Sequence, residues 1–290
     1  MSNKLINIHN DFHGYNELLK FYNINKDKFF DDIEVILEEW FDANLSALLG
    51  GTLDKIQNDG LNSINFIYLS PNIQTILQKN NFLSFYGYNK RDDTYHSTIE
   101  YKKFKPSDSR YFHQYLEDDL LNHTRFPNMS DVLHEKISES IHEMFVNAQI
   151  HSETDFIYTC GQYFYQRNEI NFTIVDTGIG FAKRIQKDLG FEISSSQAIT
   201  WAMIDGNTTK QGVSGGLGLI ILKEFIMNNQ GKIQIVSGDA FYELQNKKEN
   251  IKKLDAYLDG SVISMTFKTN DTKTYNFSDE KEKLNIDDIF

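Results

Sequence analysis

The sequence predicts an α+β protein, in which a small α/β unit precedes an α/β sandwich with helices on one face of a mixed sheet. The N-terminal third alternates strand-like and helical patterns, whereas the later part places a long helix before two consecutive strands. The 290 residues also leave room for two domains of roughly 150 residues. We expect domains at residues 1–100 and 130–270, a junction at 101–129 and an acidic tail at 271–290.

The N-terminal elements follow from apolar spacing. Residues 30–37 carry apolar side chains at every second position, which predicts a strand. Asp42 stands at a helix N-cap position, and apolar residues follow it at helical offsets. Residues 63–69 are β-branched enough for a second strand, and Ser70-Pro71 then starts a second helix. Short connections between these elements imply a parallel pair of strands.

The junction is predicted from its polar composition. Residues 94–130 contain two of the three prolines, Pro106 and Pro127, and three closely spaced lysines. A helical pattern then covers residues 131–150, with its apolar side chains on one face. The later elements are two strands, a helix and two strands, at residues 155–165, 169–176, 217–228, 232–236 and 261–267.

Composition excludes several classes of protein. Asp and Glu number 41 against 29 Lys and Arg, a net charge of −12, so a general nucleic-acid binder is disfavoured. The single cysteine, Cys160, rules out an intramolecular disulfide and a zinc site built from cysteines. We find no apolar segment of membrane-spanning length and no signal-peptide pattern, and so expect a cytoplasmic protein without a membrane partner.

Three segments carry residues suited to chemistry. In the first, Glu143, Asn147 and His151 recur every four residues and share one stripe of the long helix, although an ordinary solvated helix face does the same. In the second, Asp176 ends a strand and is followed by Gly178 and Gly180. This carboxylate can accept from an exocyclic amine beside a backbone that a flat ligand approaches closely. A tight turn explains the same residues.

The third segment is rich in glycine and runs directly into a helix. Its residues are Gly215, Gly216, Leu217 and Gly218, and backbone N–H groups at a helix start attract anions. The segment matches neither the P-loop nor the dinucleotide fingerprint. A flexible loop that caps a buried helix remains the alternative.

The order and spacing of the three segments resemble the GHKL (Bergerat-fold) ATPases, which include gyrase, a heat-shock chaperone, histidine kinases and mismatch-repair proteins. The resemblance covers residues 130–269, and the helix around Glu143 is most similar to the anti-sigma-factor serine kinases. It implies that ATP and Mg²⁺ are bound. A sensor histidine kinase is disfavoured because no phosphoacceptor histidine lies on a separate upstream hairpin.

The resemblance also implies roles for individual residues. Asn147 would coordinate Mg²⁺, Asp176 would contact the adenine amine, and Gly178 and Gly180 would shape the adenine pocket. The glycine-rich segment at residues 215–218 would donate backbone N–H groups to the phosphates.

Further implied roles fall on the lid, the last strand and the catalytic base. Residues 181–215 correspond to an ATP lid, in which Thr209 and Lys210 belong to the part that folds over the nucleotide. Ser261 stands where relatives have threonine near the adenine. Glu143, one helical turn from the magnesium ligand, would act as general base on water or on a protein hydroxyl.

The N-terminal unit resembles a STAS-type domain in the order of its elements. Such domains are the phosphorylatable partners of anti-sigma kinases, and their acceptor hydroxyl follows the Asp at a helix start. Here Asn44 holds that place and has no hydroxyl, so we do not expect a phosphorylation switch. The unit is then a docking or dimerisation module, or it simply packs on its neighbour.

Three functions remain open at this point. The first is an ATPase that acts as a nucleotide-driven regulatory switch on a protein partner or through self-association. The second is a serine/threonine kinase that acts on a separate STAS-like protein. The third is an ATP-sensing scaffold that does not hydrolyse its nucleotide.

Overall fold

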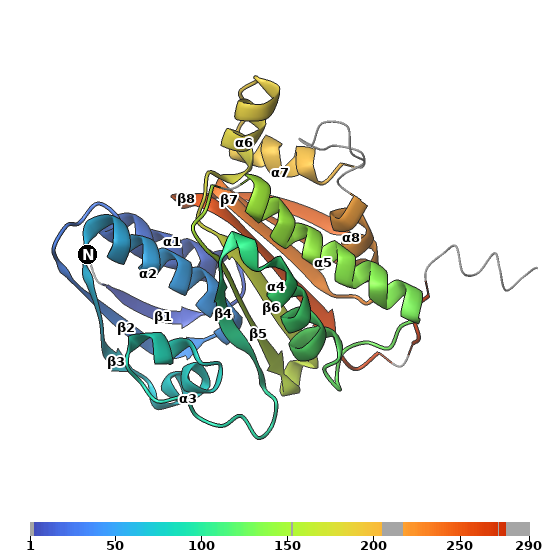
Figure 1. The fold of residues 1–290 in the computed structure, drawn as a ribbon, viewed down its shortest axis with the longest axis horizontal. Helices are drawn as coiled ribbons and strands as arrows, with labels where there is room; N and C mark the ends of the chain where they lie inside the picture. The colour runs from blue at the N-terminus through green and yellow to red at the C-terminus, as the bar shows by residue number, and fades with distance from the viewer. Residues whose placement is uncertain (1–2, 152, 205–216, 272, 277–290) are drawn as a thin grey trace, which may run out of the picture.

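The computed structural model describes residues 3–151, 153–204, 217–271 and 273–276, and its two sheets confirm the α+β class (Figure 1). A three-stranded sheet has the order β1-β2-β3, and a five-stranded sheet has the order β4-β5-β6-β8-β7. Within the described ranges, no helix combines the length and apolarity needed to cross a membrane.

The N-terminal unit is a parallel sheet with alternating helices, as its spacing predicts. Its elements are β1 (Lys4–Ile8), α1 (Phe12–Asn25), β2 (Asp32–Phe41), α2 (Ser46–Gly60), β3 (Ser63–Leu69) and α3 (Pro71–Lys79). Both neighbouring strand pairs are parallel. The strand predicted at 63–69 is confirmed residue for residue, whereas β1 and α1 lie outside the predicted elements. β2, which was predicted from residue 30, begins at Asp32 because Phe30 has a φ of 53° and a side chain that is 80% exposed.

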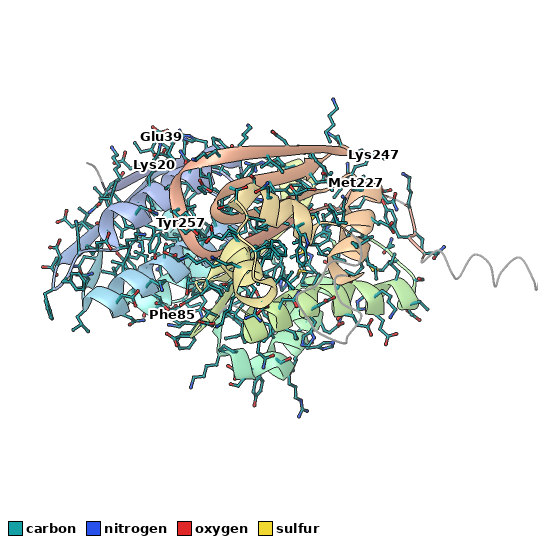
Figure 2. The ribbon with its side chains drawn as sticks, turned by 90° about the horizontal axis from the view of Figure 1, so that it is seen from above. Lys20, Glu39, Phe85, Met227, Lys247 and Tyr257 are labelled. Atoms are coloured by element: carbon teal, nitrogen blue, oxygen red, sulfur yellow. The ribbon has the colours of Figure 1, made fainter. Side chains whose placement is uncertain are left out.

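The second sheet differs from the predicted mixed sheet, because every neighbouring pair in it is antiparallel. Its strands are β4 (Thr98–Phe104), β5 (Ile157–Phe164), β6 (Glu169–Asp176), β7 (Lys232–Gln245) and β8 (Lys248–Lys268). Tight turns force this arrangement in two of the pairs, β5–β6 and β7–β8. The turn between β7 and β8 consists of Asn246 and Lys247, both with positive φ. Figure 2 labels Lys247 at the far end of this hairpin, which extends well beyond the two short strands predicted there.

The predicted junction at 101–129 is folded instead. It contains most of β4, which forms an edge of the second sheet, and α4 (Ser109–Tyr115), which is followed by a π-helical turn at Leu116–Leu121. The lysines that suggest a linker are packed on aromatic faces. The ammonium of Lys102 lies 4.6 Å from the Tyr115 ring centroid, and that of Lys103 lies 3.9 Å from the Phe156 centroid.

Part of the predicted solvated tail is also packed. Tyr275 forms a bridge with Met129 and contacts the ring of Phe225, with 5.4 Å between the ring centroids. The remaining acidic positions, 277–290, lie outside the described residues.

Each face of the second sheet is covered by a different part of the chain. α5 (Asp131–His151), α8 (Leu217–Asn228) and α4 pack on one face, around fully buried side chains such as Phe145 and Phe172. The N-terminal unit packs on the other face, where Tyr15 and Phe241 lie 5.7 Å apart between ring centroids. The predicted helical cover on one face is therefore only half of the arrangement.

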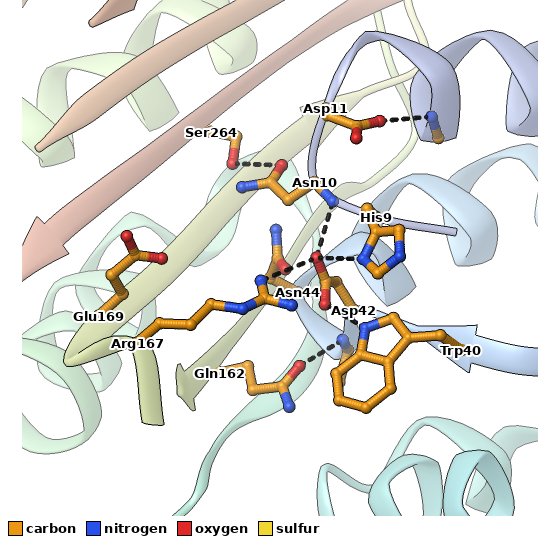
Figure 3. Close-up of polar contacts among 12 residues, drawn as sticks. His9, Asn10, Asp11, Trp40, Asp42, Asn44, Gln162, Arg167, Glu169 and Ser264 are labelled. Atoms are coloured by element: carbon orange, nitrogen blue, oxygen red, sulfur yellow. Dashed lines mark hydrogen bonds and ion pairs between the residues drawn. The ribbon is translucent and has the colours of Figure 1, made fainter. Parts of the chain in front are cut away.

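Polar contacts fix the N-terminal unit against the sheet (Figure 3). The carboxylate of Asp42 is buried, accepts the backbone N–H of Asn10 at 2.8 Å and lies 3.6 Å from the Arg167 guanidinium. Asn44 is fully buried and donates to the hydroxyl of Thr173 on β6 at 2.9 Å. Of the alternatives for this unit, packing on its neighbour is the one that these contacts support.

Candidate functional site

The three chemical segments converge at one end of the second sheet. α5 ends at His151 and β5 begins at Ile157, so the C-terminal end of α5 lies close to the start of β5 (Figure 1). Ile157 pairs with Asp176, and Asp176 pairs in turn with Ser261 on β8. α8 begins beside α5, where Gly218 contacts Glu143. Residues far apart in the sequence thus meet at this end of the sheet.

Asp176 is the central charged group at this end of the sheet. Its side chain accepts the N–H of Gly178 at 3.0 Å and the hydroxyl of Ser261, and the residue is only 5% exposed. Burial raises the pKa of this carboxyl from its ordinary 3.8 to about 6, against the opposing effect of hydrogen bonds from Ser261 and Gly178. At neutral pH the group is mostly ionised, and a carboxylate with two donors still has capacity to accept a third.

Two glycines allow the backbone around Asp176 to pack unusually closely. Gly180 has a φ of 72°, and a Cβ there would lie 2.8 Å from the carbonyl oxygen of Gly260. Gly260 has a φ of 128°, and its Cβ would lie 2.2 Å from the carbonyl oxygen of Asp176. Both positions therefore require glycine, for conformation and for space.

Ser237 is a member of this site that sequence reasoning missed. Its hydroxyl donates to the carbonyl of Gly260 at 3.0 Å and accepts the N–H of Phe181 at 3.0 Å. It thereby joins the start of α6 (Gly180–Leu189) to Gly260, which precedes Ser261 in β8. The predicted strand stopped one residue before Ser237, and a single serine in a strand carries no signature of its own.

Glu143 lies at the start of α8. One of its carboxylate oxygens, Oε2, accepts the backbone N–H of Gly218 at 3.0 Å. A Cβ on Gly218 would lie 2.3 Å from that oxygen and 3.2 Å from Cα of Ser140, so glycine permits the close approach of the two helices. A negative charge at a helix N-terminus is stabilised by the helix dipole. The structure therefore joins the first and third segments directly.

Asn147 lies one helical turn beyond Glu143, toward the sheet edge, with a half-buried side chain. Its amide makes no hydrogen bond to another described residue. Among the residues that the structure describes, no group of three or more His, Cys, Asp or Glu side chains is placed to hold a metal. An amide oxygen is a ligand of the type that hard cations such as Mg²⁺ accept.

Several predicted site residues lie outside the described part of the chain. These are Thr209, Lys210, Gly215 and Gly216, and the described structure of Leu217 is limited to its backbone at the start of α8. The first part of the predicted lid contains two helices, α6 and α7 (Ser195–Ala202). Ser194 caps α7, and Ser195 accepts the N–H of Asp239 on β7 at 3.3 Å. This part of the predicted lid is thus held against the sheet.

Comparison of the chain with models of known protein families gives no match, and a search among curated proteins gives none either. The resemblance to GHKL ATPases therefore remains a prediction, which depends on the three segments and on the geometry in which they meet.

Proposed function

We propose that this protein binds Mg-ATP in a GHKL-type (Bergerat-fold) site and acts as an ATPase that serves as a nucleotide-driven regulatory switch. The observation that carries the proposal is Asp176, a buried carboxylate at the end of β6. Its backbone is bordered by Gly180 and Gly260, two positions that require glycine. An ionised acceptor in such a place costs stability, which is typical of residues kept for binding.

Different residues of the site contact different parts of the nucleotide in this proposal. Asp176 accepts from the exocyclic amine of adenine, a group that guanine does not present at the same position. The backbone N–H groups at the start of α8 face the phosphates, where the helix dipole favours an anion. Asn147 supplies one amide oxygen to the magnesium ion, which balances the phosphate charge when it is bound.

Glu143 acts as the general base in this proposal. Its place between Asn147 and the start of α8 puts a carboxylate beside the phosphate end of the site. Asn44, at the position where a STAS-type domain has its acceptor hydroxyl, has no hydroxyl and is fully buried, which argues against this position as the acceptor of a phosphoryl group. Water is therefore the acceptor that we assign, and a separate protein would be needed for kinase activity.

Binding of ATP and GTP to the purified protein, measured by calorimetry, tests the site. We expect ATP to bind in the presence of Mg²⁺ and Asp176→Asn to weaken it at least about tenfold, because a charge-assisted hydrogen bond is lost. Asp155→Asn, at an exposed position just before β5, is the matched control and should leave binding unchanged. Absence of ATP binding by the wild type, or equal binding by Asp176→Asn, would refute the proposal.

Labelled ATP separates the three functions. Release of free phosphate by the protein alone supports the ATPase switch. Transfer of the label to a co-purified protein would replace it with a kinase, and bound nucleotide that stays intact would replace it with a scaffold.

A further inference from the structure

A shallow surface pocket lies on a different side of α5 from Glu143. Its volume is about 810 Å³, and α4, the π-helical turn after it and α5 form its walls. Its lining includes Ser107, Ser109, Arg110, His113, Glu117 and His142. His142 and Glu143 are consecutive on α5 and point about 100° apart. His142 contacts α4 while Glu143 contacts α8, so the pocket is separate from the candidate nucleotide site.

The guanidinium of Arg110 is the unpaired cation of this pocket, which the Glu117 carboxylate also lines. Arg110 is exposed and forms no ion pair or hydrogen bond with any residue that the structure describes. The two nearby carboxylates are already engaged: Asp108 accepts the N–H of Lys105 at 2.9 Å, and Glu117 accepts the hydroxyl of Ser138. Because neither carboxylate pairs with it, the guanidinium of Arg110 remains able to bind an anion from solution.

Hydroxyl and imidazole groups surround the Arg110 side chain. The hydroxyl of Ser109 lies 2.8 Å from Nε2 of His142, and the ring of His142 stacks on that of Phe112 with 6.2 Å between centroids. The ring of His113 lies 5.5 Å from the ring of His142, and its Nε2 is 3.5 Å from the Ser138 hydroxyl. Imidazole and hydroxyl groups donate to an anion without adding the desolvation cost of further charges.

We propose that this pocket binds a phosphate monoester, with Arg110 pairing with the phosphate oxygens and with Ser109 and His113 donating beside it. A planar guanidinium matches two oxygens of a phosphate, and the remaining oxygens require further donors of the kind that the pocket walls supply. A carboxylate would leave several of these donors unused. The volume admits the organic group of an ester as well as its phosphate.

NMR spectroscopy of the histidine side chains tests this assignment in the full-length protein. We expect inorganic phosphate and O-phosphoserine to shift the signals of His113 and His142 saturably, whereas acetate at equal ionic strength does not. Arg110→Ala should weaken binding of both phosphate probes at least about tenfold, the loss expected for a charge-assisted pair. Arg91→Ala is the control, because it removes a charge of the same type that is bonded to Thr75 on α3.

Three results would overturn the proposal. They are absence of saturable shifts in the wild type, equal affinity for acetate, and unchanged binding by Arg110→Ala. Binding of inorganic phosphate without O-phosphoserine would overturn the assignment to an ester. Ser109→Ala provides a second test, with a smaller loss of affinity expected, and thermal unfolding of each variant verifies its fold. None of these readouts involves ATP, so the result is independent of the proposed function.

Discussion

Replacing Asp176 with asparagine should stabilise the fold at neutral pH while it removes nucleotide binding. Burial raises the pKa of this carboxyl from 3.8 to about 6, and the difference corresponds to about 3 kcal/mol of free energy. Asparagine can still accept the N–H of Gly178. Its NH2 group, however, replaces the oxygen that accepts the Ser261 hydroxyl, and the loss of this hydrogen bond offsets about 1 kcal/mol of the gain. We expect a net stabilisation of about 1–3 kcal/mol at pH 7.5.

The pH dependence distinguishes this cause from altered packing. Because the folded pKa lies above the unfolded one, the folded state binds more protons between about pH 4 and pH 6. The wild type therefore loses stability as pH rises through this window, whereas Asp176→Asn lacks this loss. Urea unfolding at pH 4 and pH 7.5 should show little difference at the lower pH and the full difference at the higher. A variant that is less stable than the wild type at pH 7.5, or a difference independent of pH, would refute the reasoning.

The remaining predictions concern α5 and α8, two of the helices that cover one face of the second sheet. Glu143→Gln should retain ATP binding and abolish turnover in a phosphate-release assay; turnover at the wild-type rate contradicts its role as base. Gly218→Ala should lower the free energy of unfolding in urea by about 1 kcal/mol, since its Cβ would lie 3.2 Å from Cα of Ser140 and would displace the Glu143 carboxylate. Phe145→Ala should lower it by about 3–5 kcal/mol, because the buried ring stacks on Phe112 at 4.5 Å; a loss below 1 kcal/mol would contradict that packing.

Sequence patterns predicted those elements that begin and end at clear turn or helix-start residues. β3 and α8 begin and end where their patterns do, because turn or capping residues bound them. β4 escaped prediction because Lys102 and Lys103 suggest solvent, although their stems lie on aromatic rings. The outer half of the β7–β8 hairpin carries many charged side chains at its exposed positions. Its extended conformation depends on pairing between the two strands, which a local sequence pattern does not reveal.

The candidate site was predictable where chemistry needs special residue types. A carboxylate followed by spaced glycines, and glycines at a helix start, leave a trace in sequence because few other residues can replace them. Ser237 leaves none, since its contribution depends on Gly260 being brought opposite it by strand pairing. The pocket around Arg110 was missed for a related reason: its walls come from a segment that composition alone presents as a junction.

The contact between Glu143 and Gly218 links binding to catalysis in the proposed function. The carboxylate accepts an N–H at the start of α8, where the phosphates of the nucleotide are expected to bind. A phosphate carries more charge than a carboxylate and competes for the same donor, so its arrival would displace Glu143 toward the attacking water. On this proposal, the protein would hold the base before ATP binds, and the nucleotide would release it. Glu143→Gln weakens this competition, because a neutral amide is a poorer acceptor, and ATP should then bind at least as tightly as in the wild type.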